Sequence, residues 1–183
     1  MNNGVEEDII IRGCLNGDIK AQELLYKNYY GSMINLCMRY MKSEEDAVDA
    51  LNNGFLKVFR NLQRYDPSQA SLYTWIRTVV VRCCLDVIKK KNKVETFHPL
   101  MPDNGLSVQP EAIEKFKASE VLQLVRRLAP ATQTVFNLYV VEGYNHREIA
   151  DLLGVSEGTS KWHLSEARKN LRKMIKQQEL NHS

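Results

Sequence analysis

Basic side chains gather in two separate stretches of the chain, and each stretch could bind a polyanion. Residues 77–93 contain a single carboxylate, Asp86, and residues 161–176 contain only Glu166. Lysine and arginine attract the phosphates of nucleic acids, but a solvated helix face can be equally basic. Both interpretations stay open on charge alone. The cations are Arg77, Arg82, Lys89, Lys90, Lys91 and Lys93 in the first stretch, and Lys161, Arg168, Lys169, Arg172, Lys173 and Lys176 in the second.

Aromatic side chains lie beside the first basic stretch. Tyr65, Tyr73 and Trp75 come just before Arg77. Aromatic rings stack on unpaired bases while cations follow the backbone, so this combination is typical of a surface for single-stranded or melted DNA. The alternative is that Tyr73 and Trp75 belong to a hydrophobic core. The loop 64–70 is the part of this region that we most expect to be open.

No pattern in the sequence indicates an enzyme or a metal site. The four cysteines include no C-x-x-C pair, and the four histidines are scattered, so we expect reduced, mostly buried thiols and no bound metal or other cofactor. Neither a phosphate-binding loop nor a set of residues around a nucleophile is found. We therefore expect a binding protein without catalytic residues.

The composition is typical of a soluble globular protein, with 44% hydrophobic and 26% charged residues among 183. No apolar run approaches the roughly 20 residues of a membrane-spanning helix. The N-terminus lacks the basic and apolar segments of a signal peptide. We expect a cytoplasmic protein that does not insert into the membrane.

Apolar residues recur mostly at helical spacing, which predicts an all-α fold. Long helices are predicted over 18–42, 44–62 and 72–93, with Ser43 and Ser71 as N-caps. Asp66-Pro67 marks a turn before the third helix. The first helix is expected to bury Leu24, Leu25, Tyr29, Met33, Leu36, Cys37 and Tyr40. The second is expected to bury Ala47, Leu51, Phe55, Val58, Phe59 and Leu62.

Residues 95–112 separate this region from a second helical one. The segment contains three prolines and a glycine and has no apolar period. Such a composition is typical of a flexible linker. We predict two small helical domains, 1–94 and 113–183, joined by this linker.

Residues 143–173 predict a helix-turn-helix. Asn145 can cap a short helix, with Glu148 at its third position, and Gly154 suits the left-handed end of that helix. Ser156 can cap the helix that follows. A helix-turn-helix places its second helix in the major groove of DNA. The alternative is a helical hairpin that touches no DNA.

The second helix of this motif turns polar residues outward. Lys161 can reach guanine acceptors, Glu166 can accept from a cytosine amine, and Trp162 can touch a thymine methyl group or serve only in packing. His163 is expected to be a neighbour rather than a contact. The residues expected to bind DNA are Lys161, Trp162, Ser165, Glu166, Arg168, Lys169 and Arg172, of which the last three suit the backbone.

Three segments resemble, in order, those of an extracytoplasmic-function (ECF) sigma factor of bacterial RNA polymerase, a member of the sigma-70 family. Residues 45–66 resemble the core-binding helix, 70–93 the promoter-melting segment, and 128–173 the C-terminal domain. Two residues depart from the usual pattern of this family. Position 160 is usually apolar but is Ser160 here, and position 162 is usually a small residue but is Trp162 here. The competing interpretation is a self-contained helix-turn-helix regulator, which would bind a palindromic duplex without polymerase.

The resemblance implies an initiation factor that binds core polymerase and promoter DNA and is controlled by an anti-sigma factor. The first domain would bind the clamp of the largest subunit and the minus-ten strand, and the second would bind the minus-thirty-five duplex. The implied contacts with core polymerase also include the flap. The implied core-binding residues are Asp46, Asp49, Leu51, Asn52, Phe55 and Leu56. The implied minus-ten residues are Arg64, Tyr65, Ser68, Ser71, Tyr73, Arg77, Arg82, Lys89 and Lys90.

Overall fold

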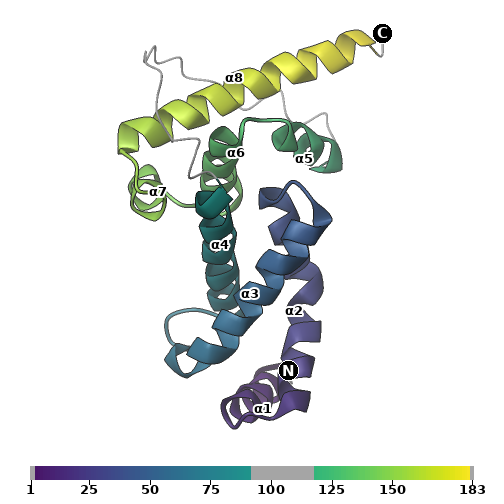
Figure 1. Ribbon diagram of the computed structural model, residues 1–183, viewed down its shortest axis with the longest axis vertical. Coiled ribbons are helices and arrows are strands. Elements are labelled where there is room, and N and C mark those ends of the chain that lie inside the picture. Colours follow the sequence, from purple (N-terminus) through teal and green to yellow (C-terminus); the bar gives the residue numbers. More distant parts are fainter. Residues whose placement is uncertain (1–2, 92–117, 182–183) are drawn as a thin grey trace. The chain divides into compact units, whose positions relative to one another are not determined.

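The computed structural model describes residues 3–91 and 118–181 (Figure 1). The predicted linker, 95–112, lies outside the described residues. Tertiary contacts divide the chain into two compact units, residues 1–93 and 94–183. All regular structure in the described parts is helical, which confirms the predicted all-α fold. None of the helices described has the length and apolar character needed to cross a membrane.

Unit 1 is built on a central helix, α3, that packs against both α2 and α4 (Figure 1). The N-terminal helix α1 packs against α2 and against the short turn η1. Ser43 Oγ accepts from the Asp46 backbone N at 3.2 Å, and Ser71 Oγ accepts from the Thr74 backbone N at 3.2 Å, which confirms both predicted caps. The elements are α1 (Asn3–Leu15), α2 (Ile19–Tyr40), α3 (Glu44–Asn61), η1 (Leu62–Arg64) and α4 (Leu72–Lys91).

The core of unit 1 follows the predicted apolar stripes with three exceptions: Tyr29 and Phe59 are half-buried, and Leu24 is exposed. Leu24 was expected inside, but its residue is 43% exposed. The buried stripe of α2 passes through Leu25 and Met33, and a neighbouring residue is rotated by about 100° from that stripe. Leu24 therefore lies at the edge of the helix. The fully buried large side chains of this unit are Leu25, Met33, Leu36, Leu51, Phe55, Val58, Leu72, Ile76 and Val80.

Gly54 of α3 lies close against Val80 of α4. A Cβ added at Gly54 would lie 3.0 Å from Val80 Cγ2 and 3.5 Å from Val80 Cα. Val80 is fully buried, and a β-branched side chain in a helix cannot rotate away easily. We expect Gly54→Ala to lower the free energy of unfolding by about 1 kcal/mol, because overpacking outweighs the gain in helix propensity.

The matched control for this prediction is Gly31→Ala in α2. Nothing lies within 4 Å of a Cβ added at Gly31. This change should raise the free energy of unfolding by about 0.5–1 kcal/mol, as for alanine replacing glycine at an open helix position. Urea unfolding of the two variants measures the difference. Equal gains at Gly54 and Gly31 would show that the helices do not meet so closely.

Unit 2 places the long helix α8 against α5, α6 and α7 (Figure 1). Pro130 is the first residue of α6, where its fixed φ suits the first helical turn. The next turn, η2, is a π-helix, in which the Glu142 backbone N donates to the Asn137 O at 2.9 Å. The elements are α5 (Ala118–Arg126), α6 (Pro130–Phe136), η2 (Asn137–Val141), α7 (His146–Leu153) and α8 (Glu157–Asn181). The buried core includes Leu124, Val135, Leu138, Ile149, Leu153, Leu164, Ala167 and Leu171.

Candidate nucleic-acid interface

The turn between α7 and α8 is fixed by local hydrogen bonds. Asn145 Oδ1 accepts from the Glu148 backbone N at 3.0 Å, and Glu148 Oε2 accepts from the Asn145 N at 2.8 Å. Gly154 ends α7 in the left-handed conformation, with φ at 72°. Ser156 Oγ then accepts from the Thr159 backbone N at 3.0 Å at the start of α8. These contacts confirm the predicted helix-turn-helix and set the direction in which α8 leaves the turn.

The predicted minus-thirty-five residues form one side of α8 that is open to solvent. Lys161, Ser165, Lys169 and Arg172 are exposed, and the other members of the set are half-buried: Trp162, Glu166 and Arg168. Lys161 Nζ lies 3.8 Å from Glu157 Oε2, and Lys169 Nζ lies 3.7 Å from Glu166 Oε2. Exposed pairs of this kind contribute at most about 1 kcal/mol. Both lysines can therefore exchange these partners for a phosphate or a base.

Polar groups beneath α8 hold this side in place. His163 is buried, and its Nδ1 lies 3.1 Å from Thr132 Oγ1. Ser160 is fully buried, with its Oγ 2.9 Å from His146 Nδ1, and the His146 ring stacks on Tyr139 with centroids 4.6 Å apart. Burial lowers the pKa of both imidazoles, which favours their neutral forms. The buried Ser160, which departs from the expected apolar pattern, thus forms a hydrogen bond with the first residue of α7.

The loop between η1 and α4 forms a second candidate surface, on unit 1. Asp66 Oδ1 accepts from the Ser68 backbone N at 2.9 Å and from Ser68 Oγ at 2.7 Å. These hydrogen bonds hold the pKa of Asp66 below its usual range and fold the loop into a turn. Arg64, Ser68, Ser71 and Tyr73 are exposed. The loop is open, as the sequence predicts.

Aromatic rings line this loop from two helices. The rings of Tyr65 and Trp75 lie 5.7 Å apart, and both residues are half-buried. The ring of Tyr73 lies 6.3 Å from that of Tyr29, which comes from α2. Sequence reasoning missed Tyr29 here because its spacing placed it on the apolar stripe of α2. Trp75 thus packs against the loop without being fully buried.

The basic residues of α4 continue from this loop. Arg82, Lys89 and Lys90 are exposed, and Arg77 is half-buried. Asp86, the carboxylate of this stretch, accepts a hydrogen bond from Lys57 Nζ of α3 at 2.8 Å. This bond raises the pKa of Lys57 and offsets the negative charge of Asp86. The carboxylate of Asp86 therefore offsets little of the positive charge that the exposed cations of α4 present to solvent.

The residues expected to bind core polymerase are divided between the surface and the interior of α3. Asp49, Asn52 and Leu56 are exposed, and Asp46 is half-buried. The expectation that Leu51 and Phe55 make such contacts is not supported, because both are buried. Their spacing places them on the stripe that faces α2 and α4, where they form the core instead.

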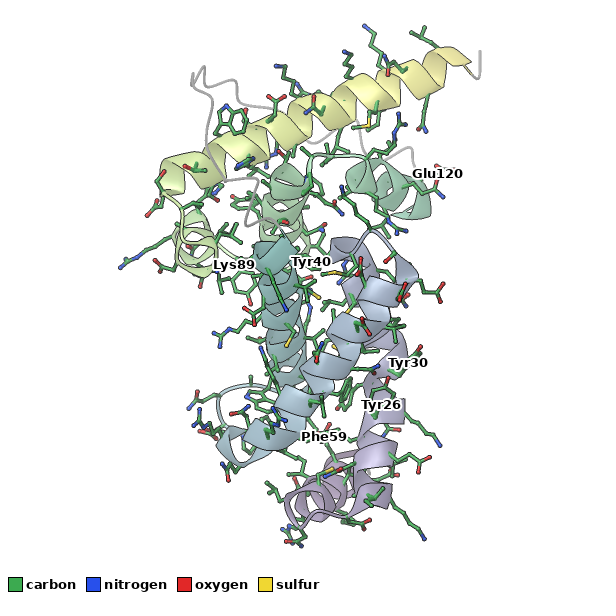
Figure 2. All side chains as sticks on the ribbon, in the orientation of Figure 1. Tyr26, Tyr30, Tyr40, Phe59, Lys89 and Glu120 are labelled. Carbon is green, nitrogen blue, oxygen red and sulfur yellow. The ribbon has the colours of Figure 1, made fainter. Side chains whose placement is uncertain are left out.

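Tyrosines of α2 extend the exposed side of α3. The Tyr26 hydroxyl donates to Asn52 Oδ1 at 2.9 Å, and the Tyr26 ring meets Phe55 edge-on with centroids 4.7 Å apart. Tyr30 lies one turn further along α2, 5.6 Å from the Tyr26 ring (Figure 2). These two rings and Asn52 make a surface with both apolar and polar character.

The cysteines take no part in either surface. All four are buried and reduced, and Cys84 Sγ lies 3.7 Å from Cys37 Sγ inside unit 1. Across the described residues, no group of three or more histidine, cysteine, aspartate or glutamate side chains is placed to hold a metal ion.

Comparisons with known proteins match the two units to two regions of one protein family, in the same order along the chain. Residues 25–94 match the family described as sigma-70 region 2, and residues 118–171 match sigma-70 region 4. The ECF RNA polymerase sigma factor SigM of Mycobacterium tuberculosis (strain ATCC 25618 / H37Rv) is 27% identical over 162 residues, which cover 87% of this chain and 79% of that protein.

More distant relatives span nearly the whole chain. The ECF RNA polymerase sigma-E factor of Haemophilus influenzae is 19% identical over 187 residues, covering 96% of this chain and 98% of that protein. Among solved structures, the sigma factor RpoE of Bartonella quintana, in complex with the anti-sigma factor NepR, superposes with a TM-score of 0.53 at 14% identity. That similarity covers 86% of this chain and 98% of RpoE and concerns the fold. With regions 2 and 4 matched in sequence and in order, the chain belongs to the ECF group of the sigma-70 family of RNA polymerase sigma factors.

Proposed function

We propose that this chain binds core RNA polymerase in the cytoplasm, directs it to a set of promoters and helps to melt them. The observation that carries the proposal is the presence of two surfaces with different chemistry in one chain. One is a helix side suited to duplex DNA, and the other is an open loop with aromatic rings, suited to unpaired bases. Phosphoryl transfer belongs to the polymerase, and this chain acts by binding.

Unit 2 would read the minus-thirty-five element as a duplex. The first residues of a recognition helix contact base edges, and Lys161, Ser165 and Glu166 are on its open side. Lys169 and Arg172 lie further along α8 and would hold phosphates. The hydrogen-bonded turn before α8 supports this role, because a reading helix must enter the groove in one orientation.

Unit 1 would capture bases of the minus-ten strand. The loop from Arg64 to Ser71 is open, and the rings of Tyr65, Tyr73 and Trp75 lie on or beside it. Unstacking a base costs a few kcal/mol, and stacking on an aromatic side chain returns about 1–3 kcal/mol per base. The cations at the far end of α4 would follow the backbone of the same strand.

The exposed side of α3 would dock on the clamp of the largest polymerase subunit, through Asp46, Asp49, Asn52 and Leu56. Two carboxylates and an exposed leucine on the same helix suit a partner surface that is basic and partly apolar. Unit 2 would contact the flap. The buried Leu51 and Phe55 would support this side from beneath rather than touch the partner.

An anti-sigma factor would hold the chain inactive in the absence of a signal. Support comes from the family and from RpoE of Bartonella quintana, which was solved in complex with such a partner. Affinity purification from uninduced native cells tests this. A stoichiometric partner that blocks core binding is expected, and recovery of the free chain would contradict the idea.

The proposed function is tested by a pull-down with purified core polymerase, followed by permanganate footprinting on a pool of genomic promoters. Core binding together with reactive thymines near transcription starts is expected. A tight duplex footprint by the free protein, with no core binding, would instead support a self-contained regulator.

A further inference from the structure

A carboxylate from the N-terminal helix reaches the aromatic loop of unit 1. The Tyr29 hydroxyl donates to Glu7 Oε1 at 2.6 Å, and Glu7 belongs to α1. The ring of Tyr29 lies 6.3 Å from that of Tyr73. The region 2 match begins at residue 25, so α1 lies outside it. The region 2 match therefore does not include Glu7.

The neighbourhood of Glu7 is the loop itself. Helix α1 packs against η1, which leads directly into Tyr65. Burial raises the pKa of Tyr65, and the charges of Glu7 and Asp8 raise it further, which places both carboxylates within electrostatic reach of that ring. Glu7 is half-buried, so it is held in place and still open to solvent. Glu7, Asp8 and Asp66 thus place negative charge beside the Tyr65 ring, on a surface that also carries Arg64 and the cations of α4.

A carboxylate in this position would act differently on the phosphates and on the bases of an incoming strand. It repels phosphates, so the backbone is directed toward the exposed cations of α4, such as Arg82 and Lys89. It attracts the donor groups of an unpaired base. Cytosine, adenine and guanine carry an exocyclic amine, whereas thymine presents two carbonyl oxygens around its single N–H.

We propose that Glu7 is a specificity-determining residue that accepts a hydrogen bond from the exocyclic amine of one minus-ten base held against Tyr65 and Tyr73. The inference rests on the proposed function and adds the class of base that the loop selects. Tyr29 is a positioning residue, because its hydroxyl fixes Glu7 Oε1 and so orients the carboxylate. One carboxylate oxygen can keep the hydrogen bond from Tyr29 while the other accepts a hydrogen bond from the base.

The test uses the full chain with core polymerase and pre-melted bubble templates built from a promoter recovered by footprinting. Each non-template minus-ten position carries A, C, G or T in turn, and competition measures relative affinity. Pre-melting removes the cost of opening each base pair. The wild-type complex should disfavour thymine about tenfold or more at one position.

Glu7→Gln should reduce that preference at least fivefold at the same position, because the amide has a weaker acceptor and adds donors. Tyr29→Phe should reduce it in part while keeping the ring. Glu6→Gln is the matched control, since it removes the same charge from an exposed neighbour in α1, and it should leave the preference unchanged.

The outcomes separate this inference from the proposed function. An unchanged base preference in Glu7→Gln, or an equal loss for all four bases, would overturn the role of Glu7 and leave the sigma function standing. A change that Glu6→Gln reproduces would also overturn it, since charge alone would then suffice. A wild-type chain that forms no complex with core polymerase would overturn both.

Discussion

Replacing Phe55 with alanine should lower the free energy of unfolding by about 3–5 kcal/mol, which is a large share of the stability of a small domain. Phe55 is only 2% exposed and contacts the rings of Tyr26 and Phe59, with centroids 4.7 and 6.0 Å away. Removing the ring leaves a cavity where α2 meets α3. Urea unfolding followed by circular dichroism measures the loss.

Leu56→Ala is the matched control, one residue further along the same helix. Leu56 is 52% exposed, so its truncation should change the free energy of unfolding by no more than about 0.5 kcal/mol. It should nevertheless weaken binding to core polymerase, measured by titration with a labelled chain. The reverse pattern, with Leu56→Ala unfolding the domain and Phe55→Ala stable, would contradict the division between core and surface on α3.

Lys161→Ala should change promoter choice at one base pair of the minus-thirty-five element, by about 1–3 kcal/mol. The Lys161 side chain is 62% exposed on the first turns of α8, where a recognition helix meets base edges. The holoenzyme, assembled with core polymerase, would be compared on duplexes carrying each single base-pair change. Discrimination at one position should vanish, while other positions keep theirs.

Arg172→Ala provides the contrast on the same helix. Arg172 is exposed three turns further along, where we expect a phosphate contact. Its loss should weaken binding to all sequences alike and reduce the salt dependence by about one counterion. If Lys161→Ala gives this same uniform loss, then Lys161 holds the backbone and does not read a base.

Features set by neighbouring residues could be predicted from the sequence. Helix caps depend on residues no more than four positions apart, so they can be predicted from short stretches of sequence. The examples are the N-caps Ser43, Ser71 and Asn145 and the left-handed Gly154. The stripes of apolar residues predicted most of the core for the same reason. These local signals were enough to identify the helix-turn-helix.

Other features depend on contacts between distant residues or on a choice between two roles. Helix α1 was missed because Ile9, Ile10 and Ile11 follow one another and show no helical period. The contact between Glu7 and Tyr29 joins residues 22 apart in sequence. Phe55 was expected at a partner surface as well as in the core, and only packing decides between the two.

The π-helical turn η2 indicates a position at which the chain can gain or lose one residue. A π turn holds one residue more than an α turn, and such turns arise most simply by inserting a residue into a regular helix. Removing one residue from 137–141 would replace the π turn with an α turn that covers the same rotation, so α6 would keep its orientation relative to the segment that follows. The buried side of α6 would still face α8. A difference of one residue in length among relatives should therefore be tolerated at this turn better than within the regular part of α6.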